Sequence, residues 1–474
     1  MASTPTSPSA ELPLTGRGIR IEAHGIDAIA DEERHGRARQ LFGVWAAPNV
    51  SYLSLVVGGA LVLMGLNLWQ AIAVIVVGNL FWALVGVVAV SGPAAGAPSE
   101  VIMRAMFGVR GNRVVIGING WFVSVCYVAL SWAAASVTAF SLFARAGIEL
   151  NVLGKVLVIV GIAAVTLVIS VYGHGAIVKL YTPLTLALAA VFVVLAGYVV
   201  GHTDWAYQPA ADLHGTELWA ALAGGLALVA SAALSYNNSA DFARYLPRST
   251  RPAAIAGWTT LGAFVPSVLF TALGAFAATT LDMSDPQTAL AQVLPGWFTP
   301  VFLIAVILGA IANNAMTAYS SGLALQAMGL RIRRSRSVLL DGTVGVLLTL
   351  YALLVSNFLD SVRNLLQLMV ALLGPMMAIY VVDIFLRRND YDGHALNDQT
   401  KNSPFWYTGG VNWAGIVALV AGAVVAAACL AVPGLYTGFV ANAAAGIDLS
   451  LPAGMITSAV IYAVASRPRT KEAI

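Results

Sequence analysis

Apolar runs of about 18 or more residues recur along the whole chain, and they constrain its fold more than any other feature. A run of this length forms a helix that crosses the roughly 30 Å hydrocarbon core of a bilayer. Of the 474 residues, 59% are apolar and 10% are charged, whereas a soluble domain is about a quarter charged. The sequence therefore predicts an all-α polytopic membrane protein.

The runs predict twelve transmembrane helices between two polar tails, residues 1–40 and 467–474. The first tail has no apolar segment behind a short basic start, so it does not resemble a cleaved signal peptide. The approximate boundaries of the predicted spans are 41–66, 68–91, 114–144, 152–172, 176–201, 217–243, 254–281, 297–329, 337–358, 362–387, 411–432 and 447–466.

The basic residues orient these spans. Of the 25 Lys and Arg residues, 22 fall in the two tails and in the loops on the same side, and three fall on the opposite side. Basic loops remain in the cytoplasm, so we expect both termini there and a multi-pass protein of the plasma (inner) membrane. An odd number of spans would remove this asymmetry. Because the basic residues form no stripe, we expect a lipid bilayer and a small solute as partners and no nucleic acid.

Residues 224–247 combine an apolar helix with a polar end. Polar side chains begin at Ser235 and continue through Tyr236 and Asn237 at membrane depth, without a loop. Such groups are costly there unless protein, water or a ligand binds them, and non-helical backbone is tolerated only where it lines a cavity or is covered by protein. The segment predicts a broken helix that holds a small, polar, uncharged solute.

The first span contains a second candidate interruption. Pro48 lacks a backbone donor and frees a carbonyl one turn earlier, and Asn49 follows it. One interpretation is a simple kink; the other is a break whose carbonyls face a site. The second gains weight because interrupted helices five spans apart are typical of inverted repeats with a midplane binding site.

Three more spans carry polar or helix-breaking residues. In the third, Trp121 follows Asn119 and a glycine, and it either packs or contacts the solute. In the eighth, Asn313 and Thr317 share a face with Ser320, while Asn314 lies on its flank; they bind a solute or join helices by hydrogen bonds. We expect Gly374 and Pro375 to break the tenth span.

Charged residues near the inner ends of the spans predict ion pairs. We expect Asp383 to pair with Arg387 or Arg388, and Asp241 with Arg244 at an inner gate. We expect no unpaired acidic residue at mid-membrane, which would remove the simplest candidate for a proton relay. No HExxH or GxxxxGK[ST] motif is present, so an intramembrane enzyme and a nucleotide-driven pump are disfavoured.

Short motifs in order along the chain resemble the nucleobase:cation symporters, purine–cytosine permease branch, from about residue 20 to 465. They are residues 107–108, residues 120–122, residues 240–247, Asn313 and Asn314 through Ser320, and Gly374 and Pro375 with Asp383.

The resemblance implies a five-plus-five inverted repeat, residues 41–201 and 217–387, with two extra helices in 411–466. It also implies cation-coupled import of a nucleobase by alternating access, without a cofactor, and it is compatible with a monomer. Within the same fold, the alternatives are allantoin, a hydantoin, uracil or a pyridine vitamin.

In the family, aromatic residues of the third and sixth spans enclose a flat ring, and amides and hydroxyls bind its edge. By position, Trp121 stacks on the ring and Tyr236 is the aromatic residue of the sixth span. Thr317 and Val125 stand where some members have amides, which leaves the edge contacts open. The candidates for these contacts are Asn49, Asn119, Ser235, Tyr236, Asn237, Asn313, Asn314 and Thr317.

The coupling ion also follows from the resemblance. Sodium-coupled relatives hold the cation with carbonyls of the first span and hydroxyls of the eighth, and here Ala312 and Asn313 replace the hydroxyl pair. We expect proton coupling, with sodium as the alternative and no other metal. The candidate cation-binding residues are Ala46, Ala47, Asn49, Gly309 and Asn313.

Overall fold

The computed structural model describes residues 24–210, 212–283, 286–330, 332–354, 358–432 and 434–472, and the structural statements below concern these residues. Helices dominate, and one antiparallel pair of short strands, β1 (Ala431–Val432) and β2 (Tyr436–Thr437), closes a turn. The helices in chain order are η1 (Asp31–Glu33), α1 (Gln40–Asn49), α2 (Tyr52–Leu63), α3 (Leu68–Asn79), α4 (Trp82–Ala89), α5 (Ser91–Ala95), α6 (Ser99–Ile102), α7 (Arg104–Phe107), α8 (Val109–Val115), η2 (Ile116–Phe122), α9 (Val123–Arg145), α10 (Val152–Tyr172), α11 (His174–Gly201), α12 (Gly215–Leu234), α13 (Ala240–Ala243), α14 (Pro252–Ala278), α15 (Pro286–Val293), α16 (Phe298–Ala327), α17 (Arg334–Leu354), α18 (Phe358–Leu386), α19 (Gly393–Asn397), α20 (Trp413–Cys429), α21 (Phe439–Ala443) and α22 (Ser450–Glu472).

Within the described ranges, nine helical segments are long and apolar enough to cross a membrane, and the bent pair α1–α2 makes ten. Each predicted span coincides with a helix or with adjoining helices. The last two, α20 and residues 450–466 of α22, are shorter apolar helices. A multi-pass helical protein is therefore confirmed, whereas the number twelve stays a prediction.

Two expectations about helix breaks need correction. The tenth span was expected to break at Gly374 and Pro375, but α18 runs through both residues. In the first span, α1 continues through Pro48, and the break follows at Val50 and Ser51. The axes of the two helices on either side of this break differ by 55°.

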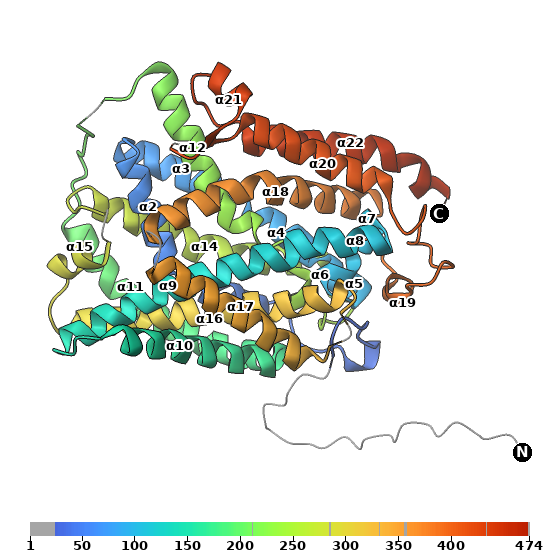
Figure 1. Ribbon diagram of the computed structural model, residues 1–474, viewed down its shortest axis with the longest axis horizontal. Coiled ribbons are helices and arrows are strands. Elements are labelled where there is room, and N and C mark those ends of the chain that lie inside the picture. The colour runs from blue at the N-terminus through green and yellow to red at the C-terminus, as the bar shows by residue number, and fades with distance from the viewer. Residues whose placement is uncertain are drawn as a thin grey trace, which may run out of the picture.

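Helix α16 runs through the lower half of the bundle in Figure 1, next to α10. In its most apolar stretch 72% of residues are buried, against 22% in α10 and α11. Helices α1, α9, α10, α11 and α17 all pack against it. Most of α16 is therefore covered by protein, whereas most residues in the apolar stretches of α10 and α11 lie on the outside of the bundle.

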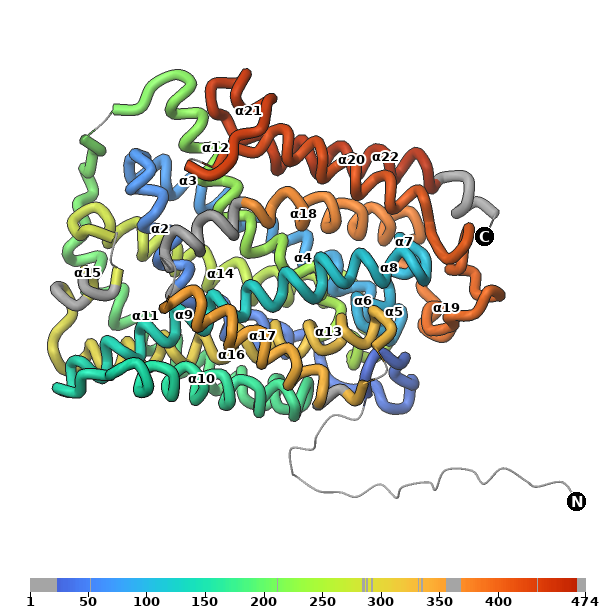
Figure 2. Tube along the Cα trace, viewed as in Figure 1, coloured from blue at the N-terminus to red at the C-terminus, as the bar shows by residue number. Residues whose placement is uncertain are grey.

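Helices α20 and α22 lie side by side along one flank, against α18 (Figure 2). The first described residues, helices α5–α8 and α19, and the end of α22 lie together at one end of the bundle (Figure 1). We call this end the terminal side.

Candidate functional site

The first helix break lies between α1 and α2. Pro48 cannot donate a backbone hydrogen bond, and Val50 N–H reaches back to the carbonyls of Ala46 and Ala47 at 3.3 Å each. Ser51 then caps α2, because its hydroxyl accepts from Leu53 N–H at 3.2 Å. A serine N-cap allows a new helix to begin, so the break falls two residues after the proline.

The second break lies between α12 and α13, at residues 235–239, as the polar run predicted. Here the chain makes turns in place of a regular helix. The rings of Tyr236 and Trp45 from α1 lie 5.0 Å apart in a T-shaped contact, and the rings of Tyr236 and Trp82 from α4 lie 5.6 Å apart. The two breaks therefore meet in the interior around Tyr236.

A cavity of about 90 Å³ lies where the breaks meet α9, α14 and α16. At roughly 10–15 Å³ for each water, this volume corresponds to about six to nine waters or to a single small ring. No charged side chain is among its described lining residues. The polar ones are Asn49, Ser51, Ser54, Ser124, Tyr127, Ser231, Ser235, Tyr236, Asn238, Ser267, Thr271, Asn313 and Thr317.

Two lining residues offer polar atoms with no hydrogen-bond partner among the described residues. These buried atoms are the Tyr127 hydroxyl and Asn238 Oδ1. Buried polar atoms are nearly always satisfied, so both are free for a solute or for water. The cavity can therefore accept and donate hydrogen bonds, and Trp82 and Tyr236 contribute aromatic side chains to its wall.

A chain of side-chain hydrogen bonds crosses the cavity wall. The Tyr236 hydroxyl donates to Asn313 Oδ1, and Asn313 Nδ2 donates to Ser131 Oγ at 3.2 Å. Thr317 Oγ1 donates to the Asn313 carbonyl at 3.1 Å. Asn313 thus joins α9, α16 and the second break, and its side chain lies in the wall of the cavity.

The structure places the predicted substrate residues in two groups. Lining the cavity are Asn49, Ser235, Tyr236, Asn313 and Thr317. Outside its lining are Trp121, Asn119, Asn237 and Asn314; of these, Asn314 donates to the Val128 carbonyl at 3.0 Å and so joins α16 to α9.

Trp121 points to α17. Its indole Nε1 donates to Asp341 Oδ1 at 2.8 Å. The tryptophan lies in the π-helical segment η2, where Val123 N–H bonds to the Ile118 carbonyl five residues earlier. Such single π turns occur often at functional sites. The cavity begins one turn further on, at Val123 and Ser124, so this conformation holds Trp121 beside the cavity and off its wall.

The candidate cation residues lie where α16 touches the first break. A Cβ at Gly309 would sit 2.2 Å from the Val50 carbonyl oxygen, so only glycine allows this approach. The nearby Ala312 carbonyl accepts from the Tyr181 hydroxyl at 2.5 Å. No described group of His, Cys, Asp and Glu residues could hold a metal ion.

A polar network closes the bundle on the terminal side of the cavity. Asp241 accepts from Ser99 N–H at 2.8 Å and from the Ser320 hydroxyl at 2.5 Å. Arg244 donates to the Gly25 carbonyl at 2.7 Å and to the Tyr319 hydroxyl at 3.1 Å. Asp241 and Arg244 each bind several neighbours here, and the direct ion pair between them stays a prediction; Ser320 belongs to this polar network and not to the cavity.

Glu100 adds a third titratable group to this network, from the short helix α6. Burial, and then the neighbouring Asp241, raise the pKa of Glu100 well above its ordinary value. Its Oε2 atom is buried and lacks a hydrogen-bond partner among the described residues. A protonated Glu100 beside a charged Asp241 avoids placing two negative charges together.

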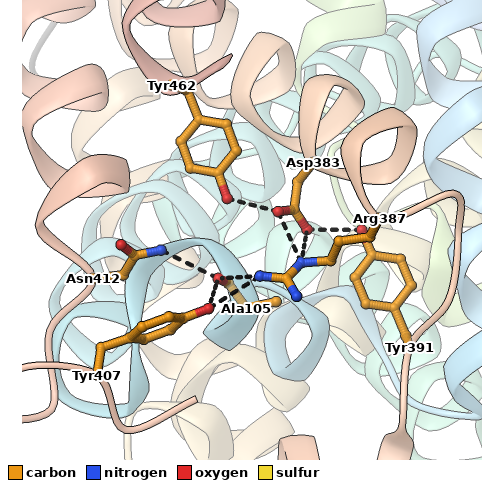
Figure 3. Close-up of polar contacts among 7 residues, drawn as sticks. All are labelled: Ala105, Asp383, Arg387, Tyr391, Tyr407, Asn412 and Tyr462. Atoms are coloured by element: carbon orange, nitrogen blue, oxygen red, sulfur yellow. Dashed lines mark hydrogen bonds and ion pairs between the residues drawn. The ribbon is translucent and has the colours of Figure 1, made fainter. Parts of the chain in front are cut away.

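The expected ion pair of Asp383 is confirmed with Arg387, at 3.0 Å. The same carboxylate accepts from the hydroxyls of Tyr391 at 2.8 Å and Tyr462 at 2.6 Å (Figure 3). Arg387 also donates to the Tyr407 hydroxyl at 3.1 Å. This cluster joins α18 to α22 and to the loops of the terminal side, away from the cavity.

Several site residues were missed by the sequence analysis. Ser124, Tyr127 and Trp82 line the cavity, and Asp341 is 2% exposed without a cation in contact. Asp341 lies near the start of the predicted span 337–358, so it does not test the expectation of no unpaired acidic residue at mid-membrane, which stays a prediction. The signal for Asp341 was a lone carboxyl in the stretch 338–350, where the other polar residues are two threonines.

A family model described as "Permease for cytosine/purines, uracil, thiamine, allantoin" matches residues 28–454. Two curated proteins of Bacillus subtilis (strain 168) are similar over nearly their whole lengths. The "Putative purine-cytosine permease YxlA" is 29% identical, over 96% of this chain and 98% of that one. The "Allantoin permease" is 23% identical, over 94% of each.

Solved structures show the same fold. The transporter Mhp1, described as a nucleobase-cation-symport-1 family member in a closed conformation with bromovinylhydantoin bound, superposes with a TM-score of 0.76 at 18% identity, over 96% of this chain and 97% of that one. Its inward-facing conformation gives a TM-score of 0.71 at 19% identity, over 95% and 96%.

Proposed function

We infer that the chain, which belongs to the family of permeases for cytosine/purines, uracil, thiamine and allantoin, imports a nucleobase through the cavity between its two helix breaks. As a member of this family it is a multi-pass membrane transport protein and not an enzyme. The substrate we propose is cytosine or a purine-like ring, carried by secondary active transport with alternating access. The observation that carries this proposal is a cavity lined by uncharged side chains, with two aromatic residues in its wall and two buried polar atoms that lack partners among the described residues.

The alternative is another small ring with amide-like edges: allantoin, a hydantoin, uracil or a pyridine vitamin. It is favoured by the names of two similar proteins, an allantoin permease and a structure with a bromovinylhydantoin bound. The volume and the uncharged lining of the cavity fit either class of ring. Stacking rewards any flat ring, and the choice among rings depends on hydrogen bonds to the edge.

We propose that protons drive the import, with sodium as the alternative. Sodium binds best where several oxygen atoms are free. In the candidate site the eighth-span hydroxyls are replaced by Ala312 and Asn313, and the Ala312 carbonyl already accepts from Tyr181. The carbonyls of Ala46 and Ala47 in the first span accept from Val50 N–H.

The proposed architecture is twelve spans, with repeats 41–201 and 217–387, helices 411–466, and tails 1–40 and 467–474 in the cytoplasm of the plasma (inner) membrane. It is supported by the helix breaks in the first and sixth spans and by the charge asymmetry of the loops. On this orientation the terminal side faces the cytoplasm.

A thermal-shift screen of the purified protein tests the substrate. The panel is cytosine, adenine, hypoxanthine, uracil, allantoin and a hydantoin, each with and without sodium. A ligand at 100 times its Kd stabilises the fold by about 2.7 kcal/mol. We expect at least one ring to raise the melting temperature, independently of sodium. If no compound raised the melting temperature, the proposed substrates would be contradicted. A shift that requires sodium would contradict proton coupling.

Variants of α16 test the cavity itself. Asn313→Ala removes a lining amide and should lower the affinity for the ring. Ser320→Ala is the matched comparison on the same helix, since its hydroxyl binds Asp241 outside the cavity, and it should leave affinity nearly unchanged. Equal, negligible effects of the two variants would mean that Asn313 only joins helices.

A further inference from the structure

Asp341 is a buried carboxyl group that the transport cavity does not use directly. It lies in α17 and is 2% exposed. Within the described part of the chain, it accepts one hydrogen bond, from Trp121 Nε1 at 2.8 Å. Its other oxygen, Oδ2, is buried and has no hydrogen-bond partner there. An ionised carboxylate at this depth normally requires a cation or several donors, and this one has neither.

The surroundings of Asp341 are uncharged. The groups that act on its carboxyl are the Trp121 indole and the Ser321 hydroxyl of α16, and Ser321 Oγ is itself buried without a hydrogen-bond partner in the described chain. Helices α9, α10, α16 and α18 pack against α17. In the described ranges these four helices carry several titratable side chains, and none of them is among the groups that act on the Asp341 carboxyl. They are Cys126, Tyr127, Arg145, Lys155, Tyr172, Tyr319, Tyr380 and Asp383, and α17 itself adds the exposed Arg336.

The backbone around Asp341 is fixed by close packing. A Cβ at Gly342 would lie 2.3 Å from Leu167 of α10, and a Cβ at Gly322 would lie 3.1 Å from Val338. Helices α10, α16 and α17 are thus in close contact on both sides of the carboxyl. Asp341 and Ser321 cannot separate easily, so Trp121 is the movable partner.

Trp121 is placed to leave this contact. A π turn contains one residue more than an α turn, so it rotates the side chains before it relative to those after it, by up to about one 100° step of an α-helix. If η2 relaxes to an α-helix, Trp121 returns to the face of Ser124, three residues on, which lines the cavity.

We propose that Asp341 is a proton-binding site that controls Trp121: the carboxylate holds the indole against α17, and the protonated acid releases it to the cavity. The proton binds at Oδ2, where Ser321 Oγ can accept it, which satisfies two atoms that otherwise lack partners. Hydrogen bonds to a charged acceptor are about twice as strong as those to a neutral one, so protonation weakens the hold on the indole.

This inference rests on the proposed function, because it assumes that the released indole stacks on the transported ring. Coupling between two sites is reciprocal. If proton binding frees Trp121 for the ring, then ring binding increases the proton affinity of Asp341. The site would therefore take up a proton and a solute together, which is the property a symporter needs.

Infrared titration of the purified protein measures the proton without any solute. A protonated carboxyl group absorbs separately from a carboxylate, and Asp341→Asn removes the group with little change of shape. We expect wild type minus Asp341→Asn to show one acid band that is present in acidic buffer and disappears as the pH rises. Ser321→Ala removes the hydroxyl beside Oδ2 and should change the pH at which the band disappears. A difference spectrum without an acid band at any pH at which the protein stays folded would overturn the proposal.

Solute binding measured against pH gives the second readout. We expect wild type to bind the ring about tenfold more tightly at the acid end, a typical coupling. Asp341→Asn should bind as acidified wild type does, at every pH. Unchanged pH dependence in this variant would overturn the proton site while leaving the proposed function intact. If no ring binds to wild type at any pH, the proposed function fails, and the infrared titration still decides whether Asp341 takes a proton.

Discussion

Asp383 on α18 and Asp341 on α17 are both buried acids on neighbouring helices, yet their surroundings differ completely. Asp383 accepts from Arg387 and from two tyrosine hydroxyls (Figure 3). Asp341 accepts from one indole, and one of its oxygens is left without a partner in the described chain. A carboxylate whose two oxygens both accept hydrogen bonds is stable as the anion. A buried carboxylate with an unpartnered oxygen is stabilised when it binds a proton. The first therefore serves the scaffold, and the second is suited to a switch.

The largest expected effect is loss of the Asp383 cluster. Asp383→Asn leaves Arg387, 21% exposed at its side chain, without a countercharge. Breaking a buried pair from one side costs about 3–5 kcal/mol, so most of the protein should fail to fold or should melt far below wild type. The measurement is the yield of monodisperse protein and its melting temperature.

Arg388→Ala is the control, because Arg388 follows in sequence but lies exposed. We expect a change within about 0.5 kcal/mol. If Asp383→Asn were as mild as this control, the contrast between the two carboxyl groups would be lost.

The hydrogen-bond donors extend the comparison. Trp121→Ala should reduce uptake at least about tenfold, equal to about 1.4 kcal/mol, because the indole stacks on the solute. The amount of protein in the membrane should change little. Tyr462→Phe removes one donor to Asp383, and its cost of about 1.5–3 kcal/mol should appear as stability and not as uptake by the folded protein. Radiolabelled uptake, corrected for the amount of folded protein, separates the two. Normal uptake by Trp121→Ala would exclude the stacking role.

Glu100 is an intermediate case, with a carboxyl that is buried next to another acid. Burial and then Asp241 raise its pKa in the folded state, so the folded protein holds a proton that the unfolded chain releases. The resulting stability is complete below the ordinary Glu pKa and is lost as the pH rises through the raised value. Glu100→Gln should flatten this decline in a pH series of melting temperatures. An unchanged slope would assign the decline to other groups.

The smallest expected effect is on the stability of Asp341→Asn. Replacing an ionised, unsaturated carboxyl by a neutral amide of the same shape should change the free energy of unfolding by less than about 1 kcal/mol, or raise it. The melting temperature at neutral pH measures this. A loss as large as that of Asp383→Asn would show that Asp341 is a structural group as well.

The sequence predicted those helix breaks that follow from the free-energy cost of a residue in its local surroundings. Polar residues at 235–239 cannot stay in a lipid-facing helix, and their break was found where expected. Pro48 signalled the first break, but Ser51 set its position by capping α2. The break expected at Pro375 is absent, since α18 continues there in close contact with α22, with Pro375 Cγ 3.3 Å from the Cβ position of Gly454.

The orientation of Trp121 could not be predicted, because it depends on a contact between distant parts of the chain. Its partner Asp341 lies 220 residues further on, and no local pattern joins the two. The π-helical segment spans Ile116–Phe122 and ends with a hydrogen bond from Val123 N–H to the Ile118 carbonyl. Residue type placed Trp121 near the site, but tertiary packing decided which way it points.

The most direct test of this account is a structure of the protein with a tightly bound ring from the screening panel, determined in acidic buffer. We predict the ring in the cavity, in contact with Tyr236 and Asn313, with the Trp121 indole stacked on it and out of hydrogen-bond reach of Asp341. A ring bound elsewhere, or bound in the cavity while Trp121 Nε1 still donates to Asp341, would contradict it.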